Sequence, residues 1–421
     1  MKNIFRDIVV AILIFEAKMV LWRHRPRVVA ISGSVGKTST KDMIYTALSG
    51  SVHVRKSEKS FNSEIGVPLT VLGLHNARHS ASGWFENIVR GVLVFFSRTY
   101  PDVLVLEVGS DHPGDMQRLS WVRPHVVVFT RFPDVPVHVE FFSSPDAVNE
   151  EDRGIRRALQ EGGVLCINAD DTNMRNEMVA EGQSMYRYGY AEGATVLLSD
   201  YAPAYTDGVL VGASVRVAYA AAQATIFLRG VVGKHYTYSV GAAALVACAA
   251  FELPLELVAK RLSSQTAADF PPGRMRVFAG VAGSVVVDDT YNASPAAVTA
   301  LLETVQGIDV SGKKVLVLGD MMELGEHTAR EHRKAGEQVA DVADVFVGVG
   351  VRMKEAVQAV QQKGNCRTEW FSDAEKAGAF LPEILGAGDI VAVKGSRHSM
   401  RMERTVKKAL ADSGDEQYLV Q

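Results

Sequence analysis

The segment that decides the fold is Gly33-Ser34-Val35-Gly36-Lys37-Thr38-Ser39, a glycine-rich turn between two different apolar patterns. The short apolar run 28–31 precedes the turn and predicts a buried β-strand, and residues 41–48 after it predict a helix. Glycines let backbone N–H groups curl round a phosphate, and a helix N-terminus adds partial positive charge. The order of strand, turn and helix therefore predicts a cradle for a nucleoside triphosphate.

Two side chains of this turn suit that chemistry. Lys37 would reach the β- and γ-phosphates, and the Thr38 hydroxyl would hold Mg²⁺. The general pattern G-x-x-x-x-G-K-[ST] is only partly matched, because Ile31 stands where its first glycine is expected and the glycine is at Gly33. An ordinary glycine turn with a surface lysine is the alternative, and the element order favours the phosphate site.

Composition restricts the class of protein. A chain of 421 residues is too long for one ordinary core and predicts two or three domains. With 47% hydrophobic and 22% charged residues, it is typical of a soluble globular protein. The net charge of −3 and the lack of a long basic run argue against a nucleic-acid partner. Cys166, Cys248 and Cys366 are far apart and form neither a metal pattern nor a disulfide framework.

The first 26 residues allow several interpretations. Residues 8–22 are mostly apolar and have basic flanks, but Glu16 and Lys18 interrupt a run that would need about 20 apolar residues to span a bilayer. We favour a helix packed on the protein. A helix lying on the membrane surface, with contact by residues 4–25, is the first alternative, and a signal or spanning helix is the second.

The remaining chain predicts an α/β protein. Apolar runs at 28–31, 103–106, 126–129 and 164–167 alternate with helical stretches, which indicates a mostly parallel sheet. Short strands at 195–198, 208–211, 214–219 and 225–228 suggest an antiparallel insertion, and 241–251 suggests a buried helix. The string Asp269-Phe270-Pro271-Pro272-Gly273 marks a boundary. Beyond it, a second, Rossmann-like α/β pattern has strands at 284–287, 314–318, 345–349 and 390–393, and residues 412–421 look like a frayed tail.

Polar residues follow several of these strands. Glu107 ends the strand 103–106 and is placed to ligate Mg²⁺, although a solvated carboxylate is an equal alternative. His138 follows 126–129, where a structural role is the usual one. Asp170 and Asp171 end another strand, as a helix cap or as nucleotide contacts. Three strand ends of the second pattern carry the polar strings 288–295, 318–325 and 393–397 and suggest a face that meets charged ligands.

Taken together, these strings resemble the Mur ligase family, and most closely its branch that adds D-alanyl-D-alanine. They run in family order from about residue 27 to 405. The matching strings are 32–39, Asn62-Ser63-Glu64-Ile65-Gly66-Val67-Pro68, 106–109, His138 with Phe142-Ser143-Ser144, 168–171, Gly273-Arg274, 288–295, 318–325 and 394–397.

The resemblance implies domains at 1–26 (an apolar helix), 27–272 (P-loop-type, ATP-binding) and 273–421 (C-terminal α/β). It also implies an ATP-dependent, ADP-forming ligase that makes an amide through an acyl phosphate, with ATP and Mg²⁺ as cofactors. The expected substrates are a UDP-muramyl tripeptide and D-Ala-D-Ala, in the cytoplasm or at the inner face of the membrane, and we expect a monomer.

The resemblance also assigns residue roles. Lys37, Glu107, His138 and Asp152 would be catalytic, and Thr38, Glu107, His138 and Asp152 would hold metal. The nucleotide would contact Gly33, Ser34, Val35, Gly36, Lys37, Thr38, Ser39, Arg274 and Asp289, and the substrate Asn62, Lys394, Ser396 and Arg397.

Three departures from the family pattern stand out. The family usually has a carbamylated lysine about fourteen residues after the histidine, where this chain has Asp152, so we expect Asp152 or Glu151 to supply the oxygen without CO₂. Tyr236 and Ser239 stand where asparagines usually lie near the adenine. Only about 26 residues precede the loop, so the domain that grips the UDP end is not expected here.

Two other functions stay open. The same ATP chemistry could act on another carboxylate, such as that of a lipid-linked or polymeric acceptor, and the apolar N-terminus would suit this. A nucleotide-binding homologue without ligase activity is the other alternative, and Asp152 in place of the lysine keeps it open.

Overall fold

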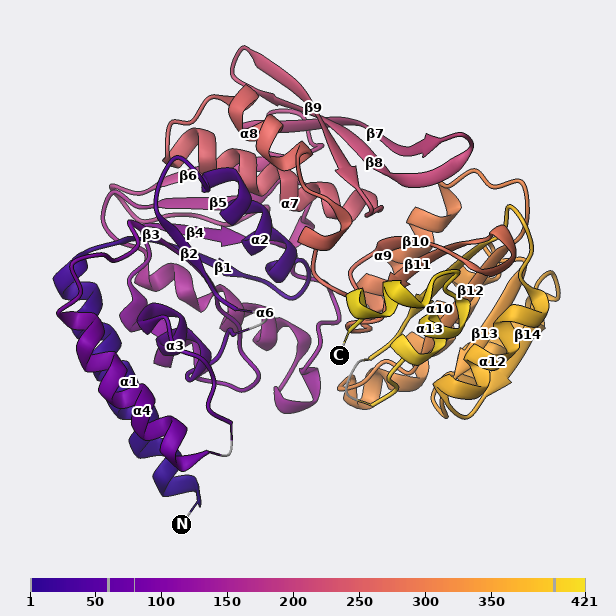
Figure 1. The fold of residues 1–421 in the computed structure, drawn as a ribbon, viewed down its shortest axis with the longest axis horizontal. Coiled ribbons are helices and arrows are strands. Elements are labelled where there is room, and N and C mark those ends of the chain that lie inside the picture. Colours follow the sequence, from indigo (N-terminus) through magenta and orange to yellow (C-terminus); the bar gives the residue numbers. More distant parts are fainter. Residues whose placement is uncertain (1, 59–60, 79, 397–398, 421) are drawn as a thin grey trace.

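The strands of this computed structural model, which describes residues 2–58, 61–78, 80–396 and 399–420, form two separate sheets (Figure 1). The first sheet has the order β2-β3-β1-β4-β5-β6-β7-β8-β9. It is parallel from β2 to β7 and antiparallel from β7 to β9. Its strands are β1 (Arg27–Ser32), β2 (Val54–Lys56), β3 (Val103–Glu107), β4 (Val126–Phe129), β5 (Val164–Asn168), β6 (Ser184–Gly189), β7 (Val196–Thr206), β8 (Val209–Tyr219) and β9 (Ala222–Arg229).

Strand β1 lies at the centre of the parallel part, between β3 and β4. Because successive side chains of a strand point to opposite faces, its apolar run serves two cores. Val29 and Ile31 are buried in the core that contains residues of α2 and α7, and Val28 and Ala30 in the core that contains residues of α1 and α3. A continuous apolar strand is what this double burial requires.

Helices cover both faces of the first sheet (Figure 1). They are α1 (Lys2–His24), α2 (Lys37–Leu48), α3 (Gly66–Leu72), α4 (Ala81–Phe95), α5 (Asp115–Leu119), α6 (Pro145–Arg153), α7 (Lys234–Leu245) and α8 (Leu255–Ser263). Helix α7 continues as a π-helical turn over Val246–Ala250, so the predicted buried helix at 241–251 is confirmed in position.

The second sheet has the order β10-β11-β15-β12-β13-β14, and only the edge strand β10 is antiparallel. Its strands are β10 (Arg276–Ala279), β11 (Val285–Asp289), β12 (Lys314–Gly319), β13 (Val345–Val349), β14 (Arg367–Phe371) and β15 (Ile390–Lys394). The accompanying helices are α9 (Pro295–Gln306), α10 (Thr328–Val339), α11 (Lys354–Lys363), α12 (Ala374–Ile384) and α13 (Glu403–Ala409). In both halves of the chain, strands alternate with helices, which confirms the predicted α/β fold.

Two sequence predictions differ from the structure. The runs at 208–211 and 214–219 form one strand, β8, although the predicted antiparallel pairing of this segment is confirmed in β7–β9, which continue the first sheet. The predicted frayed tail at 412–421 is wrong for its described part, because Leu419 and Val420 are buried and the Tyr418 carbonyl accepts a 3.0 Å hydrogen bond from Arg276. The domain bounds 27–272 and 273–421 stay a prediction; β9 ends at 229 and β10 begins at 276.

Helix α1 packs on the protein, as the favoured interpretation predicts. Val9, Leu13, Ala17 and Val20 are buried against the layer that includes α3. Among the described residues, no helix is long and apolar enough to cross a membrane. The polar residue within the apolar run, Glu16, is also buried, at 7% exposure.

Glu16 lies where α1 meets α4. A Cβ atom added to Gly91 would come within 2.1 Å of Glu16 Oε2, so the Glu16 carboxylate occupies the space that a side chain at position 91 would take. In the described part of the chain, Oε2 has no hydrogen-bond partner. Burial raises the pKa of Glu16 to about 7, from an ordinary value of 4.5.

This burial predicts that stability depends on pH. The folded state binds the Glu16 proton more tightly than the unfolded chain, so the contribution is fully present below about pH 4.5 and is lost as the pH rises towards 7. We expect the loss to be about 2 to 3 kcal/mol. Glu16→Gln should remove this part of the pH dependence of urea unfolding, whereas Glu161→Gln at an exposed site should not. An unchanged pH slope in Glu16→Gln would contradict the assignment.

Candidate active site

The glycine-rich turn joins β1 to α2 with two residues in the left-handed region. Gly33 has φ 129°, and Gly36, just before α2, has φ 91°. The Ser34 N–H donates to the Arg131 carbonyl at 2.8 Å, which ties the turn to the chain after β4. Lys37 begins α2 and donates its ammonium to the Gly33 carbonyl. The turn thus places backbone N–H groups, a helix N-terminus and a lysine together, as the sequence predicts.

Gly33 cannot carry a side chain in this arrangement. An added Cβ would lie 2.3 Å from Thr130 Oγ1 and 3.2 Å from the Arg131 backbone nitrogen. We expect Gly33→Ala to destabilise the fold by about 2 kcal/mol or more and to weaken ATP binding. Gly162→Ala is the matched control, because Gly162 has φ 70° but no atom within 4 Å of an added Cβ. Urea unfolding and calorimetry would test both; equal effects in the two variants would contradict a special role for Gly33.

Oxygen donors for a divalent cation meet at the start of α2. The Thr38 hydroxyl donates to Glu107 Oε2 at 3.0 Å, and both side chains are buried. Two neighbouring ligands of an octahedral Mg²⁺ with bonds of about 2.1 Å lie about 3 Å apart, so this pair fits Mg²⁺ in donor type and spacing. The ammonium of Lys41, also buried, lies 3.8 Å from the same carboxylate oxygen.

A second group of predicted residues lines one small cavity beside the turn. Its lining includes Lys37, Asn62, His138 and Asp152. These four residues are spread over more than a hundred positions of the sequence, and they meet because the strands of the first sheet lie next to one another. Catalytic roles were predicted for three of these four, and a substrate role for Asn62.

Asp152, in α6, is held in this cavity by Ser110. Its Oδ1 accepts hydrogen bonds from the Ser110 amide at 3.1 Å and from the Ser110 hydroxyl at 2.7 Å. Burial raises the pKa of Asp152, and the charge of Lys37 and the Ser110 hydrogen bonds oppose the rise. Glu151 instead accepts from the Met116 amide at 2.8 Å. Of the two predicted oxygen donors, Asp152 is therefore the one that lies with Lys37.

His138 connects this cavity to the second half of the chain. Its Nδ1 lies 2.8 Å from Glu323 Oε2, and its Nε2 lies 3.5 Å from Asp111 Oδ1. Burial lowers the pKa of His138, but the hydrogen bond to Glu323 and the charges of Glu323 and Asp111 outweigh it, so the pKa lies above its ordinary value. Glu323 follows β12. Its contact with His138 therefore links a loop of the second sheet to a loop of the first sheet at the predicted metal site.

At the strand ends of the second sheet, two predicted residues pair with each other. Lys394 donates to Asp289 Oδ2 at 2.5 Å, and both side chains are buried. Burial lowers the pKa of Lys394, and the charge of Asp289 opposes this. The Arg274 guanidinium lies over the Tyr291 ring at 4.2 Å. Ser396 is buried, and Arg397 lies outside the described residues.

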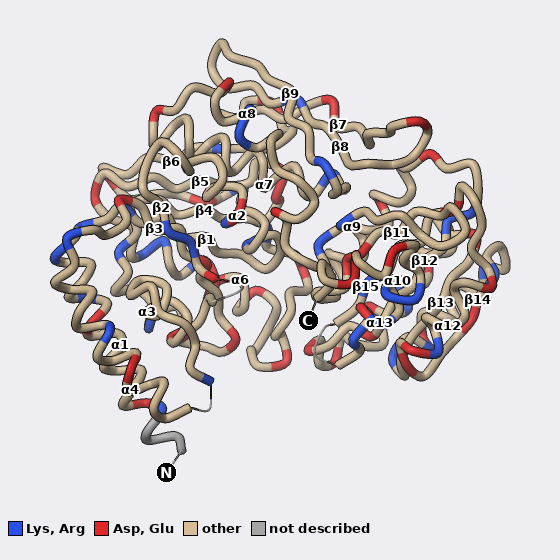
Figure 2. The backbone as a smooth tube through the Cα atoms, in the orientation of Figure 1, with Lys and Arg blue, Asp and Glu red and all other residues tan. Residues whose placement is uncertain are grey.

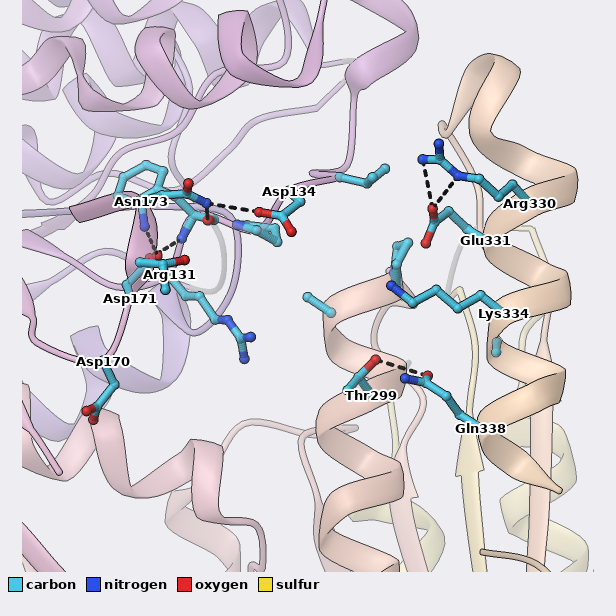
Figure 3. A pocket seen from close by; sticks show the side chains of 17 residues that line it. Arg131, Asp134, Asp170, Asp171, Asn173, Thr299, Arg330, Glu331, Lys334 and Gln338 are labelled. Atoms are coloured by element: carbon cyan, nitrogen blue, oxygen red, sulfur yellow. Dashed lines mark hydrogen bonds and ion pairs between the residues drawn. The ribbon is translucent and has the colours of Figure 1, made fainter. Parts of the chain in front are cut away.

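A wider cleft of about 590 Å³ opens between the carboxyl ends of β4 and β5 and helices α9 and α10 (Figure 3). On one wall, Asp171 accepts from the Phe132 amide at 2.7 Å and from the Asn173 amide at 3.0 Å. It caps the 3₁₀ helix Thr172–Met174, which is the helix-cap role that the sequence allowed. Cations line both walls. The labelled side chains of the cleft are Arg131, Asp134, Asp170, Asp171, Asn173, Thr299, Arg330, Glu331, Lys334 and Gln338.

Several residues of these sites were not predicted from the sequence as site residues. Lys41, Ser110 and Asp111 lie near predicted residues along the chain, and their position just after a predicted strand end or loop could have suggested them. Glu323 belongs to a string singled out for the second sheet, but its pairing with His138 is a tertiary contact. Tyr236 and Ser239 are buried, and Ser239 accepts a 3.0 Å hydrogen bond from Thr40 in α2.

Comparison with known protein families identifies both halves of the chain. Residues 31–83 and 88–247 match the Mur ligase middle domain, and residues 273–397 match the Mur ligase glutamate ligase domain. The chain belongs to the Mur ligase family. Its glycine-rich turn, Thr38–Glu107 pair and His138 all lie in the part that matches the middle domain.

Individual relatives show which members of the family this chain is similar to. The chain is 27% identical to the UDP-N-acetylmuramoyl-tripeptide--D-alanyl-D-alanine ligase of Bacillus subtilis, over 93% of this chain and 77% of that protein. Its identity to the Escherichia coli ligase of the same name is 26%, over 92% and 77%. Among solved structures, MurF ligase from Thermotoga maritima in complex with ADP superposes with a TM-score of 0.76 at 25% identity, covering 97% of this Mur ligase and 84% of that chain. MurF from Acinetobacter baumannii shares the fold, with a TM-score of 0.76 at 22% identity over 94% and 79%.

Proposed function

We propose that this Mur ligase joins D-alanyl-D-alanine to a UDP-muramyl tripeptide, with ATP converted to ADP and phosphate, in peptidoglycan precursor synthesis. The observation that carries the proposal is the meeting of Lys37, His138 and Asp152 in one cavity, next to the Thr38–Glu107 pair. The relatives that are named for this activity match over about nine-tenths of the chain, which supports the choice of substrates.

The chemistry follows from the charges at the site. A carboxylate of the acceptor attacks the γ-phosphorus, ADP leaves, and an acyl phosphate forms; the amine of the second substrate then displaces phosphate and forms the amide. Negative charge builds up on the transferring group, and Lys37 with the N–H groups of the turn would stabilise it. Lys394, Asp289 and Arg274 would meet the ligands from the second sheet.

Mg²⁺ is the cofactor we propose for the oxygen donors of the first sheet. Thr38 and Glu107 would hold one ion, and His138 and Asp152 would contribute to a second. When bound, the metal would neutralise phosphate charge. Asp152 would supply its oxygen without CO₂, because an aspartate carries the carboxylate that the family's lysine gains by carbamylation.

We further propose that the enzyme acts as a monomer in the cytoplasm and that α1 contacts the inner face of the membrane. The substrates named above are nucleotide-linked small molecules, which suits a cytoplasmic enzyme. Helix α1 is apolar on both sides, since it buries one side on the protein and leaves Phe15 and Trp22 exposed on the other.

A phosphate-release assay tests the assignment of substrates. With ATP, Mg²⁺, UDP-muramyl tripeptide and D-Ala-D-Ala, we expect one phosphate per amide formed, and no release when either substrate is left out. Release that requires a different amine or acid would replace the proposed pair with another carboxylate acceptor. ATP binding without turnover on any pair would identify a nucleotide-binding homologue instead.

A further inference from the structure

Helices α1 and α4 lie side by side at one end of the molecule (Figure 1) and leave apolar side chains in solvent. The residues recur at helical spacing along each helix, so each helix has an exposed apolar stripe. We call these residues the α1–α4 face: Ile8, Phe15, Met19 and Trp22 on α1, and Phe85, Val89, Val92, Leu93 and Phe96 on or just after α4. Four aromatic side chains stand out, with Phe15 65%, Trp22 64%, Phe85 70% and Phe96 72% exposed.

This clustering is unusual for a soluble protein surface. Single exposed apolar residues are common, but a contiguous set on neighbouring helices marks an interaction surface. Along the helix pair, Glu16 faces Gly91 and His24 lies beside the Val94 carbonyl, so the helices run in the same direction. The exposed apolar stripes of α1 and α4 can therefore contact one flat surface together.

The charged residues around this face are mostly basic. The exposed ones on residues 6–25 and 81–98 are six basic and two acidic: Arg6, Asp7, Lys18, Arg23, Arg25, Glu86, Arg90 and Arg98. Arg6 pairs with Glu64 and Arg90 with Glu86. In the described part of the chain, no ion pair holds Lys18, Arg23, Arg25 or Arg98, and the basic residues at the end of α1 are visible in Figure 2.

We propose that the α1–α4 face docks this ligase on a membrane surface that contains anionic lipid. The proposal extends the membrane contact of α1 to α4 and to a lipid charge, and it does not depend on which substrates are ligated. Aromatic and aliphatic side chains would enter the boundary between headgroups and acyl chains, and the free basic residues would meet lipid phosphates. The whole chain carries a net charge of −3, so the excess of basic residues around this face is opposite in sign to the charge of the chain.

A lipid surface fits this face better than a second copy of the chain. Protein interfaces are depleted of lysine and of charge at their centres, whereas Lys18 lies between Phe15 and Trp22 on the exposed side of α1. Two identical faces in contact with the same helix ends together would also place Arg23 and Arg98 against the same basic groups of the other copy. Lipid phosphates remove that repulsion.

The position of the face is compatible with turnover. Helices α1 and α4 lie at the opposite end of the molecule from the second sheet (Figure 1), so docking would leave the cleft between the two halves open. The enzyme would then work at the membrane surface while its substrates reach it from solution.

Flotation with vesicles tests the proposal on the full chain. We expect the protein to float with vesicles of phosphatidylcholine and phosphatidylglycerol, to stay behind with phosphatidylcholine alone, and to be released in part by added NaCl. The double variants Phe15→Ser/Phe85→Ser and Arg23→Glu/Arg98→Glu should each lower the partition coefficient about tenfold or more. Met178→Ser/Val351→Ser, at exposed apolar sites elsewhere, is the matched control and should bind as the unchanged protein does.

Other outcomes overturn the proposal. One is that the protein does not float with anionic vesicles, and another is that all variants bind vesicles equally. A third is that sedimentation shows a dimer which the Phe15→Ser/Phe85→Ser variant does not form. Phosphate release in solution, measured in parallel, should be the same for all these variants. A loss of vesicle binding with normal turnover separates this proposal from the ligase function, and turnover absent from every protein would contradict only the latter.

Discussion

Lys37→Ala is expected to lower the turnover of ATP at least about 1,000-fold. The Lys37 ammonium sits at the N-terminus of α2 and donates to the Gly33 carbonyl within the phosphate turn. It would be the nearest mobile positive charge to the transferring phosphoryl group. Removing a preorganised donor to developing charge costs about 100- to 1,000-fold, and here a full charge is lost as well.

Phosphate release and calorimetric ATP binding would measure the effect. Lys363→Ala, at the exposed end of α11, is the control and should leave both unchanged. Lys37 is half-buried at the surface of the turn, so we expect the variant to fold. More than a tenth of the original turnover in Lys37→Ala would show that the turn is not the phosphate site.

Asp152→Ala is expected to lower turnover about 100-fold and to raise the Mg²⁺ concentration needed for half-maximal rate. Asp152 is buried beside Lys37 and accepts two hydrogen bonds from Ser110. Its carboxylate is the oxygen donor that we assign to the metal-binding side of the cavity. The unchanged enzyme should not respond to removal of CO₂, because no carbamylated lysine is involved.

Two further variants separate this role from folding. Asp152→Asn keeps the volume and an acceptor for Ser110 but removes the charge, so it should fold normally and still lose activity. Glu151→Gln changes a carboxylate that accepts from the Met116 amide and lies apart from Lys37, and it should have little effect on turnover. If Asp152→Ala leaves Mg²⁺-dependent turnover unchanged, the assignment fails.

The chemistry of the site was largely predictable because it depends on short local patterns. Gly33, Gly36 and Lys37 follow a buried strand within a few residues, and the strand-to-helix turn needs no distant partner to form. Glu107 could be placed because parallel strands end at one edge of a sheet. Its hydrogen bond to Thr38 follows from β1 and β3 being neighbours.

The contacts between distant segments could not be predicted in the same way. His138 and Glu323 are 2.8 Å apart although 185 positions separate them, and Lys394, for which a substrate contact was predicted, pairs with Asp289. Residues 412–421 looked like a tail because a short polar stretch has no periodicity. Arg276 nevertheless donates to the Tyr418 carbonyl, and Leu419 packs in a core of the second sheet.

The amino-acid order alone determined the glycine-rich turn and the apolar strands, since each rests on spacing within one strand or loop. It also indicated the family, because the matching strings occur in family order from about residue 27 to 405. Only the tertiary structure decided that Asp152, not Glu151, lies with Lys37, that Glu16 is buried against Gly91, and that α4 adds its apolar stripe to that of α1. The physical reason is that burial and pairing depend on which surfaces meet. Helix and strand periodicity identifies a face that must be covered, but not the element that covers it.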